Sequence, residues 1–130
     1  MVPALEPGDY LLARRHRDLV RADIVVFEHP SQPAFWLVKR LIGLPGESIS
    51  ISSGLVRIGD AALIEPWASE RTAPDGTWTL GPDEAFVLSD NRAETLADSR
   101  TFGAIGANSL LKVRARYWPI GRLHVGRFHR

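Results

Sequence analysis

The stretch Phe35-Trp36-Leu37-Val38-Lys39-Arg40-Leu41-Ile42 carries the pattern that decides the fold. Large and β-branched apolar residues fill it, and a glycine and a proline follow, which is typical of a buried strand. Side chains alternate between the two faces of a strand, so Lys39 shares one face with Leu37 and Leu41. We therefore expect a lysine inside a strand, with apolar neighbours on its own face.

The rest of the chain also consists mostly of strand patterns separated by turn residues. Residues 53–54, Ser-Gly, lie between two such segments and predict a hairpin. Residues 66–78 predict a surface excursion, and residues 89–107 a long polar connection. Apart from 35–42, the predicted strands are 10–14, 24–27, 47–52, 55–58, 84–88 and 110–118. The sequence thus predicts an all-β fold, a single mainly antiparallel β-domain with little helix over residues 1–119, followed by a basic tail over 120–130.

Composition narrows the classes of function. The chain has 130 residues, 45% of them hydrophobic, and a net charge of +1, so no nucleic-acid partner is expected. It has no cysteine, which excludes disulfides, a cysteine nucleophile and zinc–thiolate sites. The four histidines are scattered without metal-ligand spacing, so we expect neither a metal nor any other cofactor.

Four segments, taken in order, resemble the boxes of the type I signal peptidase family, whose relatives include the mitochondrial inner membrane protease. The segments are residues 1–9, 21–27, 38–47 and 89–103. In the second, Ala22 replaces the usual glycine. In the fourth, Ser89 replaces a glycine, and the spacer before Asp98 is one residue longer than is common. The matching residues are Met1, Pro3, Leu5, Gly8 and Asp9 in the first box and Lys39, Arg40, Ile42, Gly43, Pro45 and Gly46 in the third.

The resemblance implies a β-rich catalytic core and a serine endopeptidase that uses a lysine as its general base. A serine hydroxyl becomes a good nucleophile only when a base takes its proton. A lysine can do so only when neutral, which requires a pKa well below the ordinary value of about 10.4. An apolar environment lowers the pKa of an amine, and Lys39 has apolar neighbours in its strand. We therefore expect Lys39 to be the general base.

The family's nucleophilic serine directly precedes the methionine that corresponds to Met1, so it is missing from this chain. The serines at 48, 50 and 52 lie on the polar face of a strand, and none offers a credible replacement. We expect a start position set too late, or a truncated chain, and we expect the 130 residues alone to be inactive.

The resemblance also implies a group of residues that braces the site and a hydroxyl that orients the lysine nitrogen. Counted from Asp90, the hydroxyl position falls on Thr95; counted back from Asp98, it falls on Leu96. We choose Thr95 because only it has a hydroxyl. The expected bracing residues are Asp90, Asn91, Arg92, Asp98, Ser99 and Arg100.

The expected partner is an extended peptide with small residues before the cut, bound by strand edges and small apolar pockets. The candidate lining residues, each equally consistent with plain core, are Met1, Pro3, Leu5, Val25 and Phe27. The leading hypothesis is removal of leader peptides from exported proteins, by a protein held at the cell membrane through a segment upstream of Met1. Its catalytic domain would lie on the extracytoplasmic side, and the 130 residues alone would be soluble. The alternatives are a cytoplasmic processing enzyme, such as a nickel superoxide dismutase maturation protease, and a non-catalytic peptide-binding relative.

Overall fold

A computed structural model of the protein describes residues 10–15, 19–117 and 128–129. Its elements are mainly strands, with one short helix, α1 (Ser99–Phe102), and one 3₁₀ turn, η1 (Ala107–Ser109). The strands are β1 (Tyr10–Arg15), β2 (Ile24–Glu28), β3 (Trp36–Gly43), β4 (Ser48–Ser52), β5 (Leu55–Ile58), β6 (Ala61–Ala62), β7 (Gly76–Thr79), β8 (Glu84–Leu88), β9 (Ile105–Gly106), β10 (Leu111–Tyr117) and β11 (Phe128–His129). The predicted all-β, mainly antiparallel fold is confirmed.

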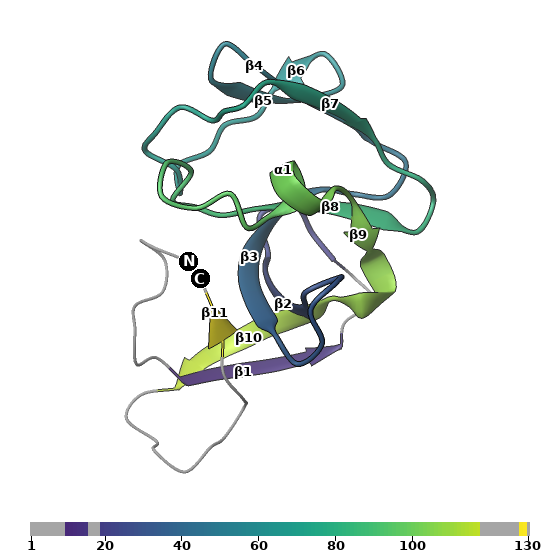
Figure 1. Cartoon of the computed structure of the whole chain (residues 1–130), viewed down its shortest axis with the longest axis vertical. Coiled ribbons are helices and arrows are strands. Elements are labelled where there is room, and N and C mark those ends of the chain that lie inside the picture. Colours follow the sequence, from purple (N-terminus) through teal and green to yellow (C-terminus); the bar gives the residue numbers. More distant parts are fainter. Residues whose placement is uncertain (1–9, 16–18, 118–127, 130) are drawn as a thin grey trace.

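The strands form two sheets. The larger has the order β1-β10-β2-β3-β8-β9, with antiparallel neighbours throughout, and β11 pairs in parallel with β3. The smaller has the order β6-β5-β4-β7. Figure 1 shows the smaller sheet at one end of the molecule and strands β1, β2 and β10 at the other, with β8 and α1 between them.

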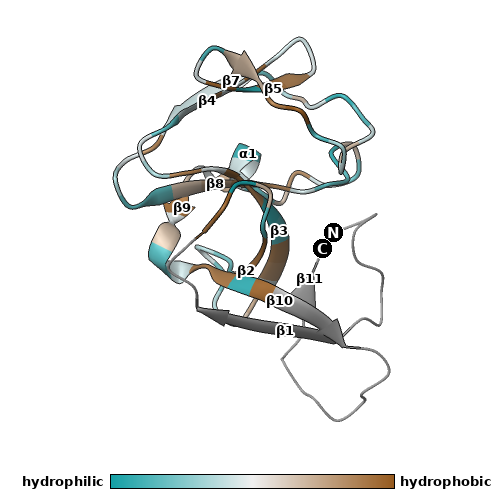
Figure 2. Ribbon diagram, turned by 180° about the vertical axis from the view of Figure 1, so that it is seen from behind, coloured by the Kyte–Doolittle hydropathy of each residue, from teal (hydrophilic) through white to brown (hydrophobic). Residues whose placement is uncertain are grey.

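Strands β3 and β8 are shared by two hydrophobic cores. Alternate residues of β3 enter different cores, with Leu41 in one and Ile42 in the other. In β8, Val87 belongs to the first core and Phe86 to the second. Figure 2 shows apolar residues along much of β3 and more polar residues in the surrounding loops. A strand covered on both faces can desolvate any side chain that it carries, and this is the setting of Lys39.

The β4–β5 hairpin was predicted correctly. Its register pairs Ser52 with Leu55, which leaves the two turn residues between them. Both have positive φ, 53° for Ser53 and 81° for Gly54, as a two-residue turn of the mirror-image type requires. A Cβ at Gly54 would also lie within 3 Å of the Arg71 side chain, which would then have to move.

Several short elements were not predicted. The excursion over 66–78 ends in β7, whose Trp78 pairs with Ile49 of β4, and the connection over 89–107 contains α1 and β9. Elements of two to four residues depend on the partner strand more than on local preference. The expected basic tail contributes β11. No helix in the described part of the chain is long and apolar enough to cross a bilayer.

Candidate active site

Lys39 lies at the centre of the larger sheet, between β2 and the end of β8. The β2–β3 register pairs it with Val25. On the other side Arg40 pairs with Leu88, so one more step places Ser89 opposite Lys39. Residues directly opposite on neighbouring strands share a face, so the lysine lies between an apolar and a hydroxyl side chain. The side chain is completely buried, and its same-face neighbours Leu37 and Leu41 belong to the first core, as the alternation predicted.

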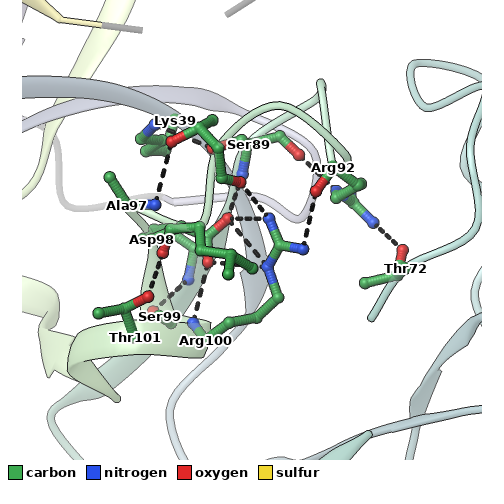
Figure 3. Close-up of polar contacts among 12 residues, drawn as sticks. Lys39, Thr72, Ser89, Arg92, Ala97, Asp98, Ser99, Arg100 and Thr101 are labelled. Atoms are coloured by element: carbon green, nitrogen blue, oxygen red, sulfur yellow. Dashed lines mark hydrogen bonds and ion pairs between the residues drawn. The ribbon is translucent and has the colours of Figure 1, made fainter. Parts of the chain in front are cut away.

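The Lys39 amine donates a hydrogen bond to the hydroxyl of Ser89. The Nζ–Oγ distance is 2.9 Å, and Ser89 is itself buried, with only 2% of its surface exposed (Figure 3). This hydroxyl is not the one expected from the sequence. The hydroxyl of Thr95 accepts instead from the backbone N–H of Ala97 at 3.1 Å. The physical reason is that Ser89 continues the line of β8 beside β3, whereas Thr95 lies in the loop that follows.

Burial lowers the pKa of Lys39 from its ordinary value to about 8. Desolvation is the main cause, because an apolar surrounding disfavours the charged ammonium. The carboxylates of Asp98 and Asp90 oppose it and the guanidinium of Arg100 adds to it. At this pKa roughly a tenth of the amine is neutral at pH 7 and half at pH 8, which suits a general base.

Asp98 connects the residues around Lys39. Its Oδ2 accepts from the backbone N–H of Ser89 at 3.0 Å, and its Oδ1 accepts from the backbone N–H of Arg100 as the N-terminal cap of α1. The Arg100 guanidinium bonds both carboxylate oxygens, at 3.0 Å from Nε to Oδ1 and 2.8 Å from Nη2 to Oδ2. One carboxylate therefore ties the residue opposite the lysine to the start of α1.

Two other expected bracing residues, Ser99 and Asp90, also make contacts with β3 and β8. Ser99 Oγ accepts from the backbone N–H of Val87 at 2.9 Å, which attaches α1 to β8. Asp90 accepts from Arg40 in a two-point ion pair, at 3.2 Å and 2.8 Å. Asn91 is half-buried next to it. These contacts hold the segment after β8 against β3.

Arg92 reaches out to a segment that the sequence did not associate with the site. Its guanidinium pairs with Glu65 at 3.2 Å and 2.5 Å. It also donates to Thr72 Oγ1 at 2.7 Å, and its Nε donates to the carbonyl of Ser89 (Figure 3). Glu65 has no strand pattern or motif around it, so its role was not visible in the sequence. Through Arg92, the 62–75 region supports the backbone of Ser89.

Two of the expected substrate-lining residues, Val25 and Phe27, lie in the first core with none of their surface exposed. The other three, Met1, Pro3 and Leu5, lie outside the described residues. In the described part of the chain, no three His, Asp or Glu side chains come together in a way that could hold a metal ion.

The family model described as signal peptidase, peptidase S26, matches residues 1–118. The chain belongs to the signal peptidase family. Signal peptidase I of Leptolyngbya laminosa is 33% identical over 143 residues, covering 95% of this chain and 66% of that protein. Signal peptidase I of Bacillus caldolyticus is 32% identical, covering 92% of this chain and 75% of that protein.

The fold is also that of a solved signal peptidase. The crystal structure of a signal peptidase I from Enterococcus faecalis superimposes with a TM-score of 0.66 at 29% identity, covering 76% of this chain and 98% of that one. The chain thus spans about two-thirds to three-quarters of the two curated relatives named above. Its β-rich core is shared with this solved signal peptidase I.

Proposed function

We propose that this protein is a serine-type endopeptidase that removes leader peptides from exported proteins, with Lys39 as the general base. The environment of Lys39 carries the proposal: the side chain is completely buried, its pKa is lowered to about 8, and its amine donates to a buried hydroxyl. A solvated lysine on a strand would have none of these properties. The family relationship supports leader peptides as the substrate class.

In the proposed reaction the neutral Nζ takes the proton of a serine hydroxyl while the serine oxygen attacks the scissile carbonyl. The ammonium then gives this proton to the leaving amine, and a water molecule hydrolyses the acyl-enzyme with Lys39 again as base. By resemblance, the serine is the residue directly before the position of Met1. The bracing residues keep the amine in place, which favours a single reactive geometry.

The edge of β3 next to Lys39 is the proposed place for an extended peptide. On this side β8 pairs with β3 from Arg40 onwards, whereas the preceding residues Trp36 and Leu37 pair with the two-residue strand β11. A peptide that adds to this edge by main-chain hydrogen bonds would pass the amine. We propose that it has small residues before the cut, and that a membrane anchor upstream of Met1 brings the site to the extracytoplasmic surface.

The test uses the chain with a methionine and a serine added ahead of Met1, and a fluorogenic leader peptide with an Ala-x-Ala cleavage site. Cleavage is expected with the added serine and is expected to vanish in its Lys39→Met variant. The matched control is Lys112→Met, because the Lys112 side chain is partly exposed and pairs with Asp23 at 3.2 Å. Full activity in folded Lys39→Met would overturn the proposal. Binding of the peptide without any cleavage would instead favour the non-catalytic relative.

A further inference from the structure

We propose that Ser89 is the positioning residue of the Lys39 amine, so that the β3–β8 register, and not the loop over 91–97, sets the direction of the base. This inference rests on the proposed role of Lys39 and adds a residue to it. The family boxes have glycine at this position, and the loop offered a different hydroxyl. Ser89, which departs from the family pattern, thus has a role of its own beside Lys39.

The contact between the two side chains follows from strand pairing. Continuing the Arg40–Leu88 pair by one residue puts Ser89 opposite Lys39 on the face of the first core. The 2.9 Å bond between Oγ and Nζ is the one hydrogen bond that this amine makes to a described residue. Both side chains are buried, so water is not available to replace the bond, and its loss would cost more than at the surface.

The backbone of Ser89 is fixed on both sides. Its N–H donates to Asp98 Oδ2 at 3.0 Å, and its carbonyl accepts from Arg92 Nε. Serine has a single side-chain torsion before its oxygen, so a fixed backbone leaves the hydroxyl few directions. The hydroxyl is thereby preorganised towards the amine, as a supporting group of a catalytic base should be.

The hydroxyl of Thr95, in the loop over 91–97, bonds to a group other than the lysine amine. Thr95 Oγ1 accepts from the N–H of Ala97, and the Thr95 carbonyl accepts from Arg100 Nη2 at 2.7 Å. These bonds shape the loop without reaching the amine. If the lysine is oriented from the end of β8, the additional spacer residue before Asp98 changes the loop and leaves the base undisturbed.

The proton-transfer step explains what the hydroxyl contributes. A neutral amine has two N–H groups and one lone pair, so donating one N–H to Ser89 restricts where the lone pair points. After Nζ has taken a proton, the ammonium still donates to the same oxygen, now in a stronger charge-assisted bond. The hydroxyl therefore favours the charged form of the amine. Among the charged groups that act on Lys39, Asp90 and Asp98 also raise its pKa, whereas Arg100 lowers it.

The experiment measures the pKa of Lys39 by NMR titration of its side chain in the 130-residue chain, which needs no catalytic serine. Removing the oxygen in Ser89→Ala and Ser89→Gly is expected to lower this pKa further, by about one pH unit, since a bond to a charged group is lost. Ser89→Thr keeps the hydroxyl and should restore the natural value. Thr95→Ala is the matched control and should leave the pKa unchanged.

A purely structural role for Ser89 would lower the melting temperature without moving the pKa of Lys39. The inference is overturned if either folded variant, Ser89→Ala or Ser89→Gly, titrates like the natural chain, or if Thr95→Ala moves the pKa equally. In the serine-bearing chain, Ser89→Ala should reduce kcat about tenfold or more with little change in KM. Should Lys39→Met prove active, the proposed function fails, while the titration still reports whether Ser89 holds the amine.

Discussion

Lys39 and Ser89 face each other across the β3–β8 pair, with the amine 2.9 Å from the hydroxyl and both side chains buried. The amine is held in a place where water does not stabilise its charge. Folding therefore increases the neutral fraction of this amine near neutral pH, and the burial that does so costs stability. The two effects can be measured separately.

The stability of the protein should depend on the protonation of Lys39. Its folded pKa of about 8 lies below the ordinary value of 10.5, so between these values the unfolded chain binds a proton that the folded chain does not. The free energy of unfolding should therefore rise as pH increases from 8 to 10.5. The Lys39→Met variant should lack this rise. At pH 7 its free energy of unfolding should exceed that of the natural chain by about 2 kcal/mol, a value that already includes the loss of the hydrogen bond to Ser89. Urea unfolding at several pH values checks it, and equal pH dependence in both chains would contradict it.

Peptide cleavage should show the same titration. In the serine-bearing chain, kcat/KM should increase with pH and level off above about 8, because only the neutral amine of Lys39 can accept the proton. A pH–rate profile with the fluorogenic leader peptide measures it. A profile that is flat from pH 6 to 9 would exclude Lys39 as the group that limits the rate.

Asp98→Asn should destabilise the fold strongly. The carboxylate is completely buried and paired with Arg100, so its neutralisation leaves a buried guanidinium without its counter-charge. The expected loss is about 3 kcal/mol of unfolding free energy. The pKa of Lys39 should also fall, because Asp98 raises it. Asp83→Asn, at an exposed position, is the control and should change neither quantity appreciably.

Deleting residues 120–130 should open the edge of β3 beside Lys39. The pairs Phe128–Trp36 and His129–Leu37 are then lost, which leaves backbone groups of β3 free to pair with a peptide. We expect faster hydrogen exchange at Trp36 and Leu37 and tighter binding of an extended leader peptide, measured by fluorescence anisotropy. Exchange rates that remain unchanged would show that β11 does not cover this edge in solution.

The sequence by itself determined the longer strands, the hairpin at 53–54 and the face of β3 on which Lys39 lies. These features depend on local alternation and turn chemistry, which can be read along the chain. The order of the boxes was likewise sufficient to indicate the family that the comparisons show.

Only the tertiary structure decided which hydroxyl meets the amine and which residues support it. Counting along the loop favoured Thr95, but the contact depends on the register between β3 and β8, which places Ser89 opposite Lys39. The pair between Arg92 and Glu65 is similarly remote in sequence. Such contacts are set by strand pairing and packing between distant segments, and no local pattern encodes them.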